Sequence, residues 1–158
     1  MTIDNKHAAI PSLYAYDKPV IVNGSGRELR VKAFKLLFDD TWLWFGQDVL
    51  ASQSVIHKID EAKFDDKHIS ILFRAVLYEW SNKHNISLSN LGKLTIVASL
   101  PPGLYQQSKL GLKAEKAYKK AFNRRQSHVK MRDGKHTIQI VTNFHSLVRE
   151  TVTYGARS

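Results

Sequence analysis

Residues 65–80, DDKHISILFRAVLYEW, carry the clearest structural signal in the chain, because their apolar side chains recur at the spacing of one helix face. The positions i, i+3, i+4, i+7, i+8 and i+11 are all apolar: Ile69, Leu72, Phe73, Val76, Leu77 and Trp80. This stripe predicts an amphipathic helix, and Asp65 or Asp66 can cap its first turn. We expect the helix to end between Asn82 and Asn85, where polar residues replace the stripe.

A buried strand, a second helix and further strands are predicted after this stretch. Residues 94–100, LTIVASL, are almost continuously apolar, which is typical of a strand buried on both faces. A helix from about Ser108 to Gln126 places apolar residues and three alanines on one side and most of a Lys/Arg cluster on the other. The small alanines allow close approach to a sheet. The remaining expected strands, with a turn at 133–134, are 129–132, 136–141 and 144–148.

The residues before the helix predict an antiparallel meander. Period-two patterns and aromatic residues favour strands here, and the glycines at 24 and 26 permit a hairpin turn. The expected strands, separated by turn signals at 23–26 and 39–40, are 8–14, 18–22, 29–37 and 41–45. Residues 46–48 end the meander, and 49–63 are expected to form a connection or a short helix.

This order of elements predicts an α/β fold, a mixed sheet with flanking helices and an antiparallel N-terminal meander. The length of 158 residues fits one domain. We expect a single domain over 1–158, with the meander and connection in 8–63 and the helix–strand–helix–strands segment in 64–158.

The composition excludes several classes of protein. With no Cys, the chain has no disulfide, no thiolate zinc site and no cysteine nucleophile. Its longest apolar runs fall far short of the ~20 residues that span a bilayer, so no membrane partner is expected. The N-terminus shows no secretory signal pattern, and we expect a cytoplasmic protein.

Positive charge is concentrated in one segment. The chain carries a net charge of +10, and residues 109–135 hold ten basic residues against two acidic ones, a net +8. Such a cluster attracts polyanions such as nucleic acid, although the solvated face of a helix has the same composition. The candidate contact residues for nucleic acid or an acidic partner are Lys113, Lys116, Lys119, Lys120, Arg124 and Arg125.

Other chemistry is sparse. The seven histidines show no metal-ligand spacing, and no nucleophile elbow, Walker or dinucleotide pattern is present. Trp42 and Trp44 share one face of a strand, where they stack on bases or cover a core, and we favour packing. Asp65 and Asp66 are interpreted as helix-capping residues, not as paired catalytic acids.

Several segments resemble ParM-like plasmid-segregation actins, within the actin, sugar-kinase and heat-shock-ATPase superfamily. Residues 94–102, LTIVASLPP, followed by Tyr105 and the lysine-rich helix, are similar to a strand and its following segment in the first lobe. The resemblance extends over about residues 10–157. The other similar segments are 10–12 (IPS), 44–49 (WFGQDV), 59–64 (IDEAKF) and 148–155 (VRETVTYG), the last with Arg149 where the family commonly has Pro.

The resemblance implies a partial ribonuclease-H-like, actin-type N-terminal lobe without the two phosphate loops of the family. The complete family binds ATP and magnesium with an Asp-x-Gly turn and nearby Lys, and with a second Asp-x-Gly-x-Thr loop. Asp4 and Lys6 stand near the start without a glycine turn, and the second loop would follow Gly155. By position, Glu150 matches the carboxylate that orients the attacking water, or it is a solvent-facing acid. We expect no bound cofactor and no ATP hydrolysis by this chain in isolation.

Two functional hypotheses follow. In the family, the strand equivalent to 94–100 pairs with the first strand, and without that partner an open apolar edge is a template for association. The first hypothesis is a truncated or split actin-like domain that associates with itself or with a complementary actin-like chain, in plasmid or DNA segregation or filament assembly. The alternative is a basic nucleic-acid-binding module that uses the 109–135 cluster.

Overall fold

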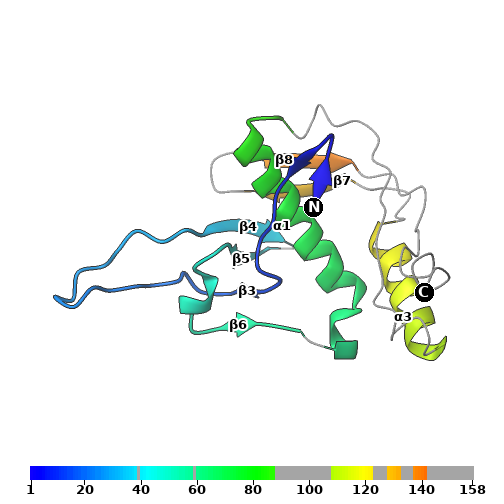
Figure 1. Cartoon of the computed structure of the whole chain (residues 1–158), viewed down its shortest axis with the longest axis horizontal. Helices are drawn as coiled ribbons and strands as arrows, with labels where there is room; N and C mark the ends of the chain where they lie inside the picture. The colour runs from blue at the N-terminus through cyan, green and yellow to red at the C-terminus, as the bar shows by residue number, and fades with distance from the viewer. Residues whose placement is uncertain (39, 59, 88–107, 123–127, 133–136, 142–158) are drawn as a thin grey trace. The chain divides into compact units, whose positions relative to one another are not determined.

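The computed structural model describes residues 1–38, 40–58, 60–87, 108–122, 128–132 and 137–141 (Figure 1). In these residues the chain is a mixed α/β protein with antiparallel strand pairs and two α-helices, which confirms the predicted α/β class. The chain divides into two compact units. The first contains Met1–Lys58, Ile71–Asn90 and Val129–Ile140, and the second contains Ile59–Ser70, Leu91–His128 and Val141–Ser158.

Apart from an N-terminal pair, the described strands form one sheet in the order β6-β3-β5-β4-β7-β8. These strands are β3 (Tyr14–Ala15), β4 (Phe34–Phe38), β5 (Thr41–Phe45), β6 (Val55–Ile56), β7 (His128–Arg132) and β8 (Thr137–Val141). The predicted strand over 41–45 is confirmed, and the one over 29–37 is reduced to β4. A turn with Asp40 at φ 66° joins β4 to β5, as the pair of aspartates predicts.

One face of the β4–β5 hairpin is the core of the first unit. Leu36 pairs with Leu43 across the hairpin, and both are buried. The Phe45 ring lies 5.7 Å from the Phe34 ring and 5.8 Å from the Phe38 ring, between ring centroids. Because side chains alternate along a strand, these five residues share a face. The Phe34 ring centroid lies 5.0 Å from that of Tyr78 in helix α1 (Asp66–His84). The aromatic alternation in the sequence therefore packs the hairpin under the helix.

The N-terminus forms a small hairpin that the sequence does not predict. β1 (Thr2–Ile3) pairs with β2 (Lys6–His7), and the turn residues Asp4 and Asn5 have positive φ. The prediction of a strand over 8–14 is wrong except at its end, where β3 begins. The backbone N–H of buried Ala8 donates to the Met1 carbonyl at 2.9 Å, so it bonds to the N-terminal hairpin.

Residues 18–33 form a long hairpin, called the arm below, which extends away from β3 and β4 in Figure 1 and is bridged near its tip. The predicted hairpin is confirmed, although the expected strand over 18–22 is reduced to one bridge between Val22 and Glu28. At the tip, the Asn23 Oδ1 accepts hydrogen bonds from the Ser25 N–H at 3.0 Å, the Ser25 hydroxyl at 2.8 Å and the Arg27 N–H at 2.9 Å. An Asn side chain that binds its own turn in this way fixes the turn conformation.

The connection before the first helix contains short elements. Residues Val49–Ala51 and Asp60–Lys63 form 3-10 turns, and β6 lies between them, so the expected connection contains a strand that was not predicted. Buried Val49 packs with Leu13 and Ala15, and these three residues form a second small core. This cluster holds the connection against β3.

Helix α1 (Asp66–His84) confirms the predicted helix and its predicted end. Its burial differs from the expected apolar stripe. Ile69, Leu72, Phe73 and Val76 are only half-buried, whereas His68 and Ser70 are buried. A helix buried on more than one side does not follow a single-stripe pattern.

The second unit packs helix α3 (Ser108–Phe122) through small residues. Buried Ala114 and Ala117 lie against Phe64, with Ile69 and Tyr118 at the margin. The Phe64 and Tyr118 ring centroids are 6.3 Å apart. The close approach that the alanines predict is therefore made to Phe64 and the first turns of α1 in the described residues, not to a strand.

Several predictions lie outside the described residues. These are the buried strand at 94–100 with its Pro-Pro-Gly end, helix residues 123–126, the turn at 133–134 and the strand at 144–148. The predicted strands at 129–132 and 136–141 are observed as β7 and β8. No described helix has the length and apolar character needed to cross a membrane.

Candidate interaction surfaces

Helix α3 presents a row of lysines to solvent. Lys109, Lys113, Lys116 and Lys120 follow the spacing i, i+4, i+7, i+11, and they form what we call the lysine face. All four are exposed, as is Lys119 beside them. Gly111, Ala114, Ala117 and Ala121 are buried on the opposite side. Of the six contact candidates from the sequence, the structure places four on this helix, and Arg124 and Arg125 lie outside the described residues.

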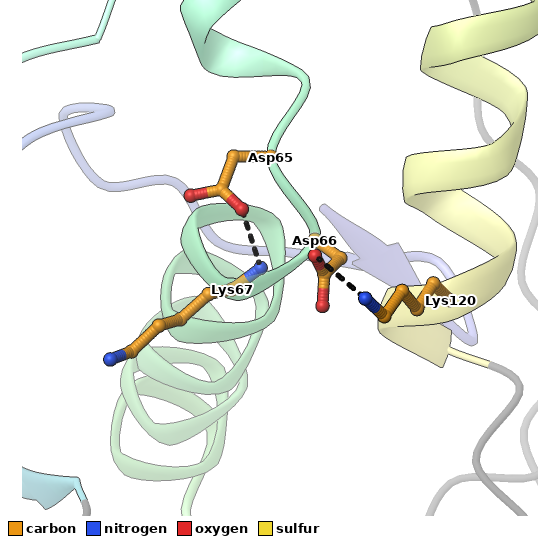
Figure 2. Close-up of polar contacts among 4 residues, drawn as sticks. All are labelled: Asp65, Asp66, Lys67 and Lys120. Carbon is orange, nitrogen blue, oxygen red and sulfur yellow. Dashed lines mark hydrogen bonds and ion pairs between the residues drawn. The ribbon is translucent and has the colours of Figure 1, made fainter.

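Ion pairs on α3 leave the lysine face accessible. The Lys119 ammonium lies 3.4 Å from the Glu115 carboxylate, one helical turn away. The Lys120 ammonium lies 3.8 Å from the Asp66 carboxylate (Figure 2). The lysine side chains in these pairs are 55% and 72% exposed. Exposed pairs of this kind contribute little and are easily exchanged, so both ammonium groups stay available to an anionic partner.

Asp65 and Asp66 act at the start of α1 as predicted, and Figure 2 shows how they lie. The Asp65 Oδ1 accepts a hydrogen bond from the Lys67 N–H at 3.3 Å, and its carbonyl accepts one from the Ile69 N–H at 3.0 Å. These are the contacts of an N-cap residue. Asp66 in the first turn is favourably placed in the positive end of the helix dipole. Helix capping therefore accounts for this acidic pair.

The arm is the second exposed surface, and it combines apolar and basic side chains. Val20, Val22 and Leu29 are 51%, 58% and 45% exposed. Tyr16 at its root and Leu50 in the connection are also exposed. The basic side chains of the arm are all exposed as well, and Glu28 is its one acidic residue: Lys18, Arg27, Arg30 and Lys32.

The root of the arm is fixed to the end of β5. The Asp48 carboxylate accepts a hydrogen bond from the Lys32 N–H at 2.7 Å, and the Asp48 N–H donates to the Lys32 carbonyl at 3.1 Å. Gly46 has φ 118°, and a Cβ there would lie 2.9 Å from the Lys32 carbonyl oxygen. A glycine is required at this position because only glycine fits both the conformation and the approach.

A second anchor joins the other strand of the arm to the connection. The Asp17 carboxylate accepts from the Gln53 N–H and the Ser54 N–H, each at 2.8 Å, and from the Ser54 hydroxyl. The Ser54 hydroxyl oxygen accepts from the Tyr16 N–H at 3.0 Å. The hydrogen bond from the Ser54 side chain, followed by that from the Gln53 backbone, lowers the pKa of Asp17 below its ordinary 3.8.

The two tryptophans pack on the second face of the sheet. Trp44 lies against Leu13, Ala15 and Val49, in keeping with the packing role predicted for it. The Lys35 ammonium lies 4.7 Å from the Trp42 ring centroid and 5.9 Å from that of Trp44. The Lys35 ammonium therefore lies within cation–π distance of both rings, and on that side it would compete with a stacked base.

Among the histidines in the described residues, His84 makes a structural contact with the N-terminal hairpin. The His84 Nε2 lies 2.9 Å from the His7 carbonyl oxygen, and the Trp80 Nε1–H donates to the Lys6 carbonyl at 2.9 Å, which fastens the N-terminal hairpin to α1. No group of three or more His, Asp or Glu in the described parts of the chain is arranged to hold a metal ion. Glu150, the candidate water-orienting carboxylate, lies outside the described residues.

The sequence analysis predicts no functional role for the arm. Its residues 28–32, ELRVK, alternate charged and apolar types in a way typical of an exposed strand. That alternation is the signal that identifies the surface, but it does not show that both strands leave the sheet. Comparison with protein-family models, with curated proteins and with solved structures finds no match to this chain.

Proposed function

We propose that the chain is an actin-type lobe of the ParM-like family, which acts in the cytoplasm by associating with another protein. The partner is a second copy or a complementary actin-like chain, and the process is plasmid or DNA segregation or filament assembly. The family assignment rests on the motifs at 10–12, 44–49, 59–64, 94–102 and 148–155. The antiparallel β3, β4 and β5 preceding α1 in the chain are compatible with it.

The apolar surface of the arm is the observation that carries the associating role. Val20, Val22 and Leu29 are each about half-exposed on one ribbon. Burying such side chains against a partner contributes roughly 25 cal/mol per Å² of apolar area, whereas leaving them in water contributes nothing. Val20 and Val22, two residues apart on one side of the arm, share a face, and exposed apolar residues grouped on one face mark interaction sites.

The proposal includes no ATP hydrolysis by the isolated chain. Its 158 residues contain no Asp-x-Gly turn of the type that binds nucleotide phosphates in the family. Catalysis of phosphoryl transfer depends on positioned phosphates and metal. Glu150 would orient water only if a partner supplied the phosphate loops, with ATP and magnesium bound to the completed site.

Size-exclusion chromatography with light scattering tests the associating role. We expect the mass to rise above the 18.0 kDa of a monomer as the concentration increases, or on addition of a complementary actin-like chain. The double variant Val20→Thr/Val22→Thr keeps the strand-forming branched side chains and removes apolar surface, so it should weaken association. Leu112→Gln on α3, an equally exposed apolar residue, is the matched control and should associate like the wild type.

A strictly monomeric mass at all concentrations, unchanged by any actin-like chain, would refute this function. Retained association in the arm double variant, together with loss in Leu112→Gln, would instead place the contact on α3.

Nucleic-acid binding is the second candidate function, and the exposed lysine face supports it. Lysines in a row on one helix would contact phosphates, and phosphate contacts carry no sequence information, so the expected binding is independent of sequence. The log of affinity for duplex DNA should fall by about 0.9 per unit log of salt for each neutralised phosphate. Lys109→Gln/Lys116→Gln should reduce this slope, whereas Lys83→Gln at the end of α1 should not. No binding at low salt would exclude this function.

A further inference from the structure

We propose that the free edge of the arm over residues 27–31 binds an extended, acidic segment of a partner protein as an added β-strand. This inference deepens the associating role and rests on it, because it names the surface and the chemistry of the partner. It involves neither the lysine face nor a nucleotide.

The hydrogen bonds of the arm show which backbone groups face outward. The Leu29 N–H donates to the Ile21 carbonyl at 2.8 Å, and the Asn23 N–H donates to the Arg27 carbonyl at 2.9 Å. Glu28 lies between these bonds, opposite Val22. In an antiparallel pair, the residue between two such bonds turns its own N–H and C=O away from its partner strand. Glu28 therefore presents outward backbone groups, and neither Glu28 nor Arg30, two residues further along, has a backbone hydrogen bond in the described residues.

Charge distinguishes the two edges of the arm. By the same rule the Val22 backbone groups face outward on the other edge, but that strand carries one cation, Lys18, whereas Arg27, Arg30 and Lys32 follow the 27–31 edge. The 27–31 edge ends at Lys32, whose N–H and carbonyl are both bonded to Asp48. A partner strand is therefore confined to a short stretch of about five residues.

Charge selects the partner. Arg27, Arg30 and Lys32 are exposed around this edge, with Glu28 the one acid among them. A strand with acidic side chains would pair favourably with these cations, whereas like charges directly opposite are destabilising. A second copy would place the same basic arm alongside, in a chain with a net charge of +10. A complementary chain with an acidic strand fits better than a second copy.

The apolar side chains favour a protein over a nucleic acid as the occupant. Phosphates would neutralise the cations but leave Val20, Val22 and Leu29 in water, where they are about half-exposed. A peptide that alternates acidic and apolar residues covers both kinds of side chain, because its side chains alternate between the two faces of the ribbon. Edge pairing supplies the main-chain hydrogen bonds.

The arm is preorganised to accept such a strand. The Asn23 side chain fixes the tip, and the contacts of Gly46 and Asp48 with Lys32 fix the root. Ordering a flexible loop on binding costs conformational entropy and so reduces affinity. Because the arm is held at its tip and its root, it loses less conformational entropy when a partner binds.

Fluorescence anisotropy with a defined probe tests the inference on the full chain. The probe is a labelled, end-capped peptide of alternating Glu and Val, and the matched control is the same peptide with Lys in place of Glu. We expect the Glu/Val peptide to bind and to shift the backbone amide NMR signals of Glu28 and Arg30. The Lys/Val peptide should not bind. Failure of the Glu/Val peptide to bind the wild type would overturn the inference.

A pair of variants separates strand addition from simple charge attraction. Glu28→Pro removes the outward N–H and an acidic charge, whereas Glu28→Thr removes the charge and keeps the N–H. Attraction to the basic arm alone predicts that both variants bind the acidic peptide more tightly than the wild type. Strand addition predicts that Glu28→Pro binds about tenfold more weakly than Glu28→Thr, because a lost hydrogen bond of about 1 kcal/mol adds to steric exclusion of the strand. Arg30→Pro against Arg30→Thr repeats the comparison.

The outcomes are distinguishable. Unchanged amide signals of β4 and β5 show that the variants fold, and equal affinities of Glu28→Pro and Glu28→Thr would then refute strand addition. Duplex DNA that binds through Arg27 and Arg30 and is insensitive to Glu28→Pro would also refute it, with nucleic acid as the occupant. Association in light scattering without peptide binding would leave the proposed function intact and exclude the arm edge. Peptide binding by a chain that never associates with an actin-like partner would remove the proposed function alone.

Discussion

Gly46 is the residue on which the position of the arm depends most directly. Its φ of 118° is unfavourable for any side chain, and a Cβ would meet the Lys32 carbonyl oxygen at 2.9 Å, which is backbone and cannot move cheaply. We expect Gly46→Ala to lower the free energy of unfolding by about 2 kcal/mol. Urea unfolding followed by tryptophan fluorescence measures this change.

Gly24 provides the matched control for that substitution. It lies at the tip of the same arm, has no positive φ, and a Cβ there would have no heavy atom within 4 Å. Gly24→Ala should change the free energy of unfolding by less than about 0.5 kcal/mol. Equal effects of the two substitutions would show that the Gly46 contact with Lys32 does not stabilise the protein.

The Ser54 hydroxyl sets the ionisation of Asp17. Because its hydrogen bond is the largest cause of the lowered pKa, Ser54→Ala should move the pKa of Asp17 back toward 3.8. A carboxyl with a folded-state pKa below its unfolded value stabilises the fold above the unfolded pKa, and this stabilisation is lost as the pH falls through the folded pKa. The anchor of the arm should therefore persist at neutral pH and weaken only in acid.

Carbon-detected NMR titration of the Asp17 carboxyl measures this pKa directly. Ser52→Ala is the control, because the Ser52 hydroxyl donates to the Asp17 backbone carbonyl at 2.9 Å and not to its carboxylate. The pKa should rise in Ser54→Ala and stay unchanged in Ser52→Ala. A lowered pKa that persists in Ser54→Ala would assign the shift to the backbone N–H groups of residues 53 and 54.

Helix α1 depends on its N-cap. Asp65→Ala should lower the free energy of unfolding by about 1 kcal/mol, since it removes the acceptor for the Lys67 N–H. Asp65→Asn keeps a capping oxygen at the same position and should cost only a few tenths of a kcal/mol. Thermal unfolding monitored by circular dichroism compares the two. An equal loss in both variants would indicate that the charge, and not the cap, stabilises the helix.

The helices and the β4–β5 hairpin were predictable because their signals are local. The apolar spacing and the acidic cap of 65–80 predict α1, and the alanines on one side of 108–122 with lysines on the other predict α3. In 34–45, side-chain alternation and a pair of aspartates give two strands and a turn. Each of these patterns lies within about 20 residues, so no knowledge of distant contacts is needed.

The errors arise where distant residues decide the structure. Residues 8–14 look like a strand, but the Ala8 backbone bonds to Met1 instead. His68 and Ser70 look like the polar side of α1, yet both are buried. The exposure of Val20 and Val22 has the same origin, since an apolar sequence does not reveal that its ribbon extends beyond the sheet. The arm surface, unlike the lysine face, therefore required the structure.

The whole chain combines two surfaces of the same charge in two different compact units. The arm belongs to the first unit and the lysine face to the second. With a net charge of +10, the chain repels its own copies and attracts anionic partners at long range. This long-range electrostatic interaction is repulsive for a second copy and attractive for an acidic partner. The salt dependence of binding therefore distinguishes the two kinds of partner.

Raising the salt from about 0.01 M to about 1 M shortens the screening length from about 30 Å to about 3 Å. If the partner is a second copy, screening removes repulsion between two chains of +10, and the mass from light scattering should rise with salt. If the partner is acidic, screening removes attraction, and binding of the Glu/Val peptide should weaken over the same range. The acidic-strand inference predicts the second behaviour. It requires in addition that the ratio of affinities between Glu28→Thr and Glu28→Pro stays near its low-salt value, because a backbone hydrogen bond is screened far less than a surface charge. A ratio that falls to one at high salt would mean that the peptide is held by charge alone.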